Sequence, residues 1–259
     1  MDRLTALAFE SYHLGLRTTR RFLRVPANWI SILFFPLIQL LAFSQLYKDI
    51  VQLPGFGGET SYLAYLAPGQ VAFTALMAVS WSGYGLLIEY RTGYLDKLRA
   101  YPISRWAILG GEMVPLFFQA AFMAGILLAV SLLLGAGLAS GVGGFILIMF
   151  LSGGFGVAFA GASFIPALLT KSEQATGTIS LLLFPLVFLS TAFVPKALMP
   201  GWMQVVNDWN PVTYLIEAIR FLMSTGFDWA VVSKAVVSLA ILGAVLQAVT
   251  FWAFRRLAG

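Results

Sequence analysis

Six apolar runs, each about as long as a membrane-spanning helix, constrain the fold of this chain more than any other feature. A helix needs about 20 residues to cross the hydrocarbon core of a bilayer. Of the 259 residues, 59% are hydrophobic and 10% are charged, whereas a soluble domain has about 25% charged residues. The expected spans are residues 29–47, 62–88, 107–134, 145–169, 175–193 and 231–254. The sequence therefore predicts an all-α integral membrane protein with a single transmembrane domain over residues 1–259.

Three of these spans have a composition that predicts more than a simple helix. The second span is longer than a bilayer requires, and we expect it to be tilted or interrupted near Pro68 and Gly69. We expect Pro185 to break the fifth span, because proline removes a backbone donor and clashes inside a helix. The fourth span is rich in Gly, Ala and Ser, and such small residues let neighbouring helices approach closely.

Two segments outside the spans are predicted to lie at the membrane surface. Residues 1–26 place arginines on one helical face and apolar residues beside them, which indicates an interfacial helix. Residues 194–230 combine prolines and tryptophans with few charges, which predicts short re-entrant helices at the outer interface. Within that segment, Asn210 is placed to cap a helix, and Glu217 and Arg220 have the i, i+3 spacing of an ion pair.

Cationic residues at the borders of the spans favour one orientation. Cytoplasmic segments of membrane proteins carry an excess of Lys and Arg. With six spans and both termini in the cytoplasm, twelve of the 16 Lys and Arg residues lie on the cytoplasmic side and four lie outside. Because the net charge of +5 is concentrated at these borders, we expect contact with anionic lipid and none with nucleic acid.

The most densely charged loop between two spans covers residues 89–105. It alternates an aromatic face with an ionic face at helical spacing, and Pro102 ends that pattern. One interpretation is a cytoplasmic coupling helix on which a cytosolic partner pushes, and the other is a loop that only anchors the protein at the lipid headgroups. The residues expected to carry the coupling are Glu89, Arg91, Gly93, Asp96, Lys97, Arg99 and Arg105.

The sequence offers no motif for catalysis or for nucleotide binding. It has no Gly-x-Ser-x-Gly elbow, no histidine pair for zinc and no P-loop of the form Gly-x-x-x-x-Gly-Lys-Ser/Thr. Cysteine is absent, which excludes disulfides and thiolate metal sites. We therefore expect no enzyme activity and no cofactor or metal in this chain; if ATP drives it, a separate polypeptide must bind the ATP.

Glu112 is an acid within an otherwise apolar run, where a charge is costly and is usually paired. One hypothesis is a proton-coupling carboxylate. The alternative is a structural acid that pairs with Arg105 or Arg91. The absence of any further acid for a proton relay favours the structural interpretation.

Aromatic residues in the first, second and fifth spans lie beside a few polar groups. An apolar ligand path is typically built in this way, with a few polar groups that orient a mostly hydrophobic compound. The residues that are candidates for such a path are Phe35, Gln39, Phe43, Ser80, Phe184 and Phe188.

Several motifs together resemble the membrane subunits of type-2 ATP-binding cassette exporters. They are Tyr-Leu-Ala-Pro-Gly at 65–69, Glu-Tyr-Arg-Thr-Gly at 89–93 followed by Pro-Ile-Ser-Arg at 102–105, and Asn-Pro-Val-Thr-Tyr at 210–214 followed by Glu217 and Arg220. The resemblance implies that residues 89–105 hold a coupling helix that inserts into a cytosolic ATPase. It also implies a dimer of permease subunits, expected to be identical, with spans one, two and five near the shared axis. Two ATPase copies would then bind the ATP and magnesium.

The resulting hypothesis is an export permease of the cytoplasmic membrane that moves drug-like or lipid-like amphipathic compounds. The resemblance is closer to the drug and antibiotic resistance branch, through the Pro-Gly at 68–69 and the Pro-Ile-Ser-Arg at 102–105. A polysaccharide or glycolipid exporter with the same scaffold is an alternative. An ion-coupled transporter that uses Glu112, or a scaffold without any path, are two others.

Overall fold

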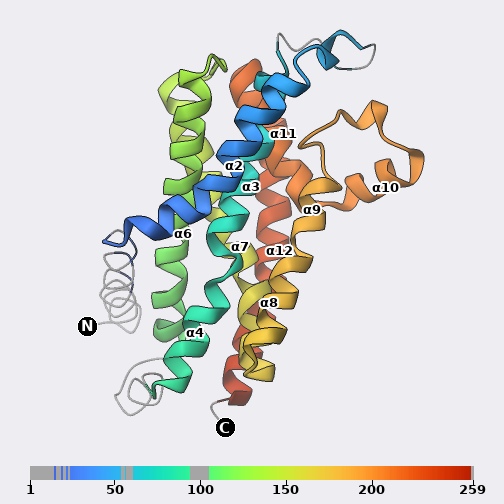
Figure 1. Cartoon of the computed structure of the whole chain (residues 1–259). Helices are drawn as coiled ribbons and strands as arrows, with labels where there is room; N and C mark the ends of the chain where they lie inside the picture. The colour runs from blue at the N-terminus through green and yellow to red at the C-terminus, as the bar shows by residue number, and fades with distance from the viewer. Residues whose placement is uncertain are drawn as a thin grey trace.

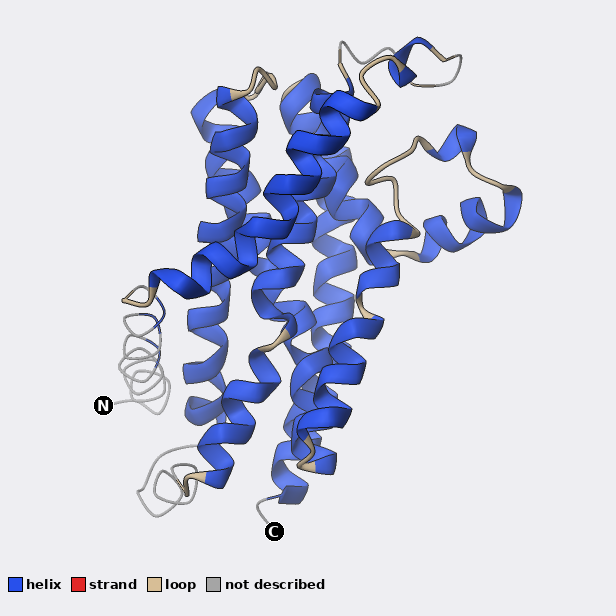
Figure 2. Cartoon of the chain, viewed as in Figure 1, coloured by secondary structure: helices blue, strands red, loops and turns tan. Residues whose placement is uncertain are grey.

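The structure is a computed structural model that describes residues 24–53, 61–93 and 105–257, together with Gly15, Thr19, Phe22 and Phe56. Within this part of the chain every regular element is helical (Figure 2). The α-helices are α2 (Pro26–Leu46), α3 (Tyr62–Ser80), α4 (Ser82–Arg91), α6 (Arg105–Leu133), α7 (Gly141–Thr170), α8 (Glu173–Leu182), α9 (Phe184–Phe188), α10 (Gly201–Trp209), α11 (Pro211–Ser224) and α12 (Trp229–Leu257), with short 3-10 helices η1 (Ile50–Gln52) and η2 (Lys196–Leu198).

Five helical segments in the described residues are long and apolar enough to cross a membrane. They are Trp29–Leu46, Tyr62–Arg91, Leu109–Leu133, Gly141–Thr170 and Trp229–Arg256. These segments confirm the all-α membrane fold and five of the six expected spans by length and composition. The expected span 175–193 instead consists of α8 and α9, which together cover Glu173–Phe188 and meet at Leu183, beside Pro185.

The core of the bundle is built on α3 and α7, while α2 and α12 lie at its periphery (Figure 1). Glycines allow α7 to approach its neighbours closely: a Cβ atom at Gly156 would lie 2.5 Å from Ala120 Cβ on α6. A Cβ atom at Gly161 would lie 2.9 Å from Leu246 Cβ on α12. The close packing expected of the small residues in span four is therefore present.

The interruption of span two lies at Trp81, not near Pro68 and Gly69 as the sequence suggested. Helix α3 continues through Pro68, and Gly69 lets it lie directly on Ala192, whose backbone is 2.7 Å from where a Cβ of Gly69 would be. The first helix of span two ends at Ser80 instead, because side chains of other helices supply hydrogen bonds to the backbone there.

Two serines from neighbouring helices satisfy the backbone at the break between α3 and α4. Ser163 Oγ of α7 accepts a hydrogen bond from the Gly83 amide at 2.9 Å. Ser180 Oγ of α8 donates to the Ser80 carbonyl. A break in a helix is tolerated inside a membrane protein only where such partners satisfy the freed backbone groups, so α7 and α8 fix the position of this break.

Residues 194–230 form the short helices expected of them. Helices α8 and α9 rise from the lower end of the bundle to about its middle, and α11 continues to the upper end (Figure 1). Asn210 caps α11 through a hydrogen bond from the Val212 amide at 3.0 Å. Helix α10 projects from the bundle and exposes Trp202 and Trp209.

Candidate coupling region and polar clusters

Helix α4 leads into the charged stretch and ends on a glycine. Its C-cap is Thr92, and Gly93 follows with a φ of +70°, a conformation that glycine adopts without strain. The Gly93 amide donates to the Tyr90 carbonyl at 3.1 Å. Of the expected coupling residues, Glu89 and Arg91 lie on α4, while Asp96, Lys97, Arg99 and the side chain of Arg105 lie outside the described residues.

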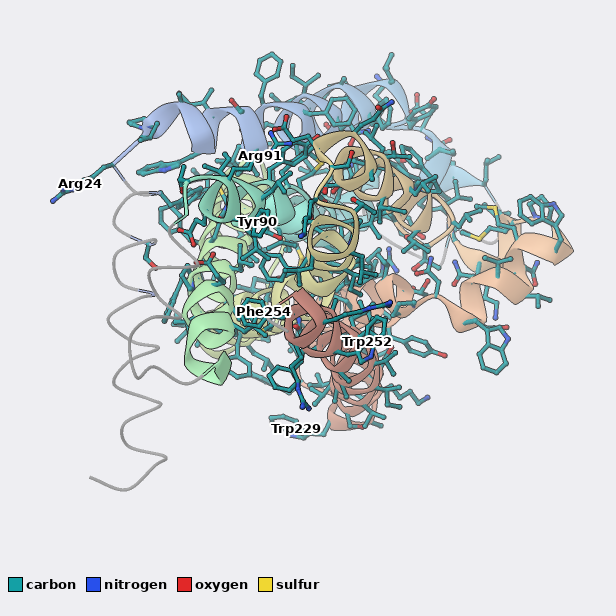
Figure 3. All side chains as sticks on the ribbon, turned by 90° about the horizontal axis from the view of Figure 1, so that it is seen from below. Arg24, Tyr90, Arg91, Trp229, Trp252 and Phe254 are labelled. Atoms are coloured by element: carbon teal, nitrogen blue, oxygen red, sulfur yellow. The ribbon has the colours of Figure 1, made fainter. Side chains whose placement is uncertain are left out.

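The end of α4 is joined to α8. Arg91 and Glu173 form an ion pair between half-exposed side chains, and Lys171 Nζ lies 4.9 Å from the centre of the Tyr90 ring. Figure 3 labels Tyr90 and Arg91 at this end of the bundle. Because an exposed ion pair contributes only about 0–1 kcal/mol, these contacts orient the two helix ends more than they stabilise them.

Closer to the break, α4 and α8 pack tightly. A Cβ atom at Gly177 of α8 would lie 2.5 Å from the Tyr84 hydroxyl of α4. Together with the hydrogen bond from Ser180 to the Ser80 carbonyl, this contact joins α8 to the second span from the break to its lower end. These contacts hold α4 and α8 against each other along their length.

Arg220 forms the centre of a second polar cluster, in the C-terminal half of α11. Its Nη1 lies 2.6 Å from Glu217 Oε1, and its Nη2 donates to the Thr191 carbonyl at 2.7 Å. The guanidinium stacks on the Tyr65 ring at 4.2 Å, and the Tyr65 hydroxyl donates to the same carbonyl at 2.9 Å. Arg220 thus pairs with Glu217 at the expected spacing and ties α11 to α3 and to the segment after α9.

This cluster borders a cavity of about 470 Å³ toward the upper end of the bundle. The ion pair between Lys196 and Asp208 lies on its rim, with both side chains substantially exposed. Because each cation of the cavity has an acid beside it, the charges are balanced within the structure.

The six residues proposed for an apolar path fall into separate groups. Phe35 and Phe184 both contact the Phe73 ring, at 6.0 and 5.7 Å between centroids. Phe43 and Phe188 both contact the Phe193 ring, at 6.1 and 5.3 Å.

The two polar members of the set are buried. Gln39 is 7% exposed, and Ser80 is 1% exposed and donates to the Leu76 carbonyl at 2.7 Å. The four phenylalanines thus form two aromatic clusters between α2, α3 and α9, one around Phe73 and one around Phe193. Ser80 lies apart from them, at the break between α3 and α4.

Glu112 lines a third site, a cavity between α2, the α3–α4 break and α6. The structure does not support pairing of Glu112 with Arg91, since Arg91 makes its ion pair with Glu173. The side chain of Arg105, the other expected partner, is outside the described residues.

Sequence reasoning missed Glu173, Ser163 and Ser180. Glu173 had a visible signal, because it is an acid in the short polar loop just before a predicted span, on the same predicted side of the membrane as the charged loop 89–105. Ser163 and Ser180 had none, since a serine in an apolar helix more often bonds its own helix backbone.

Comparison with known proteins gives consistent results. The sequence profile described as "ABC-2 type transporter" matches residues 11–224. The chain is 31% identical over 225 residues to a daunorubicin resistance ABC transporter permease of Streptomyces coeruleorubidus, covering 85% of this chain and 77% of the relative. It is 32% identical over 226 residues to the putative transport permease ycf38 of Cyanophora paradoxa, covering 83% and 74%. It is 24% identical to the probable multidrug ABC transporter permease YbhR of Escherichia coli, covering 81% and 57%.

Proposed function

Because this chain belongs to the ABC-2 type transporter family, we propose that it is the membrane subunit of an ATP-driven exporter of amphipathic or hydrophobic compounds. The family match over residues 11–224 carries the proposal. The names of two relatives, which concern daunorubicin resistance and multidrug transport, support a drug-like cargo. Family membership also favours this function over an ion-coupled transporter or a scaffold.

The proposed assembly contains two permease subunits, identical to each other, and two cytosolic ATPases that bind ATP and magnesium. In this assembly the lower end of the bundle in Figure 1 faces the cytoplasm, as do both termini. Arg91, Lys171, Arg255 and Arg256 lie near that end, which supports this orientation by the positive-inside rule. In this proposal, α8 and α9 together with α11 make the remaining crossing of the membrane, which is the fifth in chain order.

Coupling in this proposal begins at residues 89–105, where the ATPase docks. Helix α4 is a direct continuation of that stretch, and α8 is joined to α4 by the contacts of Tyr84 and Arg91. A push on the docking segment would therefore move α4 and α8 together relative to α3 and α9, with the breaks at Trp81 and Leu183 as hinges. Such a displacement biases the equilibrium between inward-open and outward-open states.

We expect the Arg91→Glu substitution to lower efflux, and the double substitution Arg91→Glu with Glu173→Arg to restore most of it. The reversed charge repels Glu173, and the exchange rebuilds the ion pair with its sign inverted. The measurement is efflux of ethidium from cells that express the chain with its ATPase. Because the pair is exposed, thermal stability of the purified chain should change little in both variants.

The exchange separates two explanations for an effect at Arg91. If Arg91 acts through Glu173, the double variant exports ethidium and the single one does not. If the double variant is as defective as Arg91→Glu alone, Arg91 does not act through α8, and the proposed transmission from α4 to α8 is wrong.

A further inference from the structure

A half-enclosed cavity of about 460 Å³ lies against the break between α3 and α4. It is separate from the coupling contacts of Arg91 and from the cluster around Arg220. Its polar and aromatic lining includes Phe22, Ser31, Trp81, Ser82, Glu112 and Gln119.

Two lining residues already donate a hydrogen bond within the structure. Gln119 Nε2 donates to the Ala78 carbonyl at 2.8 Å, and Ser31 Oγ donates to the Ala27 carbonyl at 2.8 Å. An amide or hydroxyl whose hydrogen is engaged in this way still has an oxygen that accepts. Gln119 and Ser31 therefore each offer an acceptor oxygen to a ligand, and Gln119 keeps one amide N–H donor.

Glu112 adds a carboxylate to the same wall. It precedes Gln119 by seven residues on α6, so the two side chains lie on one face of the helix, two turns apart. Glu112 already takes part in an interaction, but an ionised carboxylate accepts up to about four hydrogen bonds. A ligand can therefore donate a hydrogen bond to Glu112 while the existing interaction of this carboxylate is kept.

The rest of the wall suits an apolar body and a positive charge. Trp81 and Phe22 contribute aromatic rings, whose faces attract cations. Met77 and Leu116 contribute apolar surface. A mostly apolar cavity with a few polar groups that fix orientation is typical of sites for small ligands.

We propose that this cavity binds an amphipathic compound that carries a primary or secondary ammonium group. The ammonium group donates to the carboxylate of Glu112, and the apolar body lies against Trp81. Because Trp81 and Ser82 form the break between α3 and α4, the bound compound contacts the start of the helix that leads to the coupling region. The inference deepens the proposed function by naming the chemical class of the cargo, and it rests on that function only for the transport step.

The test is a binding measurement on the purified chain, without any ATPase, in nanodiscs of phosphatidylcholine. The probe is dansylcadaverine, an aromatic compound with a primary ammonium group, and the comparison is its N-acetyl derivative, which is neutral. Energy transfer from tryptophan to the dansyl group reports binding, after subtraction of the signal from empty nanodiscs. We expect dansylcadaverine to bind about tenfold or more tightly than the acetylated probe, as for hydrogen bonds to a charged partner.

Substitutions locate the site. We expect Glu112→Gln to weaken dansylcadaverine binding about tenfold or more and to leave the acetylated probe unaffected. The matched control is Asp228→Asn, which removes an acid just before α12 that does not line the cavity and should bind like the wild type. Trp81→Phe should lower the energy transfer, whereas Trp252→Phe on the exposed side of α12 should not.

Equal affinity of the wild-type chain for the two probes would overturn the proposal, and so would unchanged binding in Glu112→Gln. The comparison of the two probes uses the wild-type chain, so it decides the question even where a variant does not fold. Failure of this binding would leave the exporter standing with another cargo. Failure to find an ATPase partner would contradict the exporter without affecting the binding result.

Discussion

Replacing Arg220 with methionine is expected to lower the free energy of unfolding by about 1–3 kcal/mol, the typical cost of removing one partner from a buried hydrogen-bonded group. The side chain of Arg220 is 10% exposed and that of its partner Glu217 is 36% exposed. The substitution leaves Glu217 without its cation and the Thr191 carbonyl without one of its two donors. Stepwise denaturation with dodecyl sulfate in mixed micelles would measure the loss.

A second ion pair of the same cavity provides the matched control. Lys196 and Asp208 are 42% and 59% exposed, so Lys196→Met should cost about 1 kcal/mol or less. The double variant Arg220→Met with Glu217→Gln should recover part of the loss, because the uncompensated acid is removed. If Arg220→Met and Lys196→Met were equally stable, the cluster would not hold α11 against α3.

Substituting Gly93 with proline is expected to abolish coupling while the bundle remains folded. Proline fixes φ at about −65°, whereas Gly93 has a φ of +70° and donates its amide to Tyr90. The chain would therefore leave α4 in a different direction and misplace the docking segment. We expect ethidium efflux to fall about tenfold or more, the range of a typical coupling free energy between sites.

Gly135 serves as the control for this substitution. It lies in the turn after α6 at the opposite end of the bundle and has a φ of +104°. Gly135→Pro imposes similar backbone strain far from the docking segment, so efflux should be largely kept. If the two prolines reduced efflux equally, the effect would be one of folding, and the docking role of the segment after α4 would lose its support.

The spans could be predicted from the sequence because each depends on local composition. Five helical segments long enough to cross a membrane lie where the apolar runs predict them. Pro185 marks the break between α8 and α9. Asn210 and the i, i+3 spacing of Glu217 and Arg220 are also local signals. The structure has both the helix cap and the ion pair that they predict.

The breaks and contacts that come from other helices could not be predicted in this way. Pro68 is compatible with a continuous α3, since Gly69 packs on Ala192, whereas the break at Trp81 depends on Ser163 and Ser180. These serines are 80 and 100 residues distant in sequence from the groups they bind. Arg91 and Glu173 are likewise 82 residues apart, so no local pattern connects them.

Purification of the tagged chain from its native membrane in mild detergent would show whether this permease is driven by a separate ATPase docked at residues 89–105. Mass spectrometry of the intact complex then gives the partners and their stoichiometry. We predict a P-loop ATPase in equal numbers with the permease, present with the wild type and lost when the charges of Arg91, Lys97 and Arg99 are reversed together. Recovery of a homo-oligomer with no ATPase from the wild-type chain would show that the permease is not driven in this way.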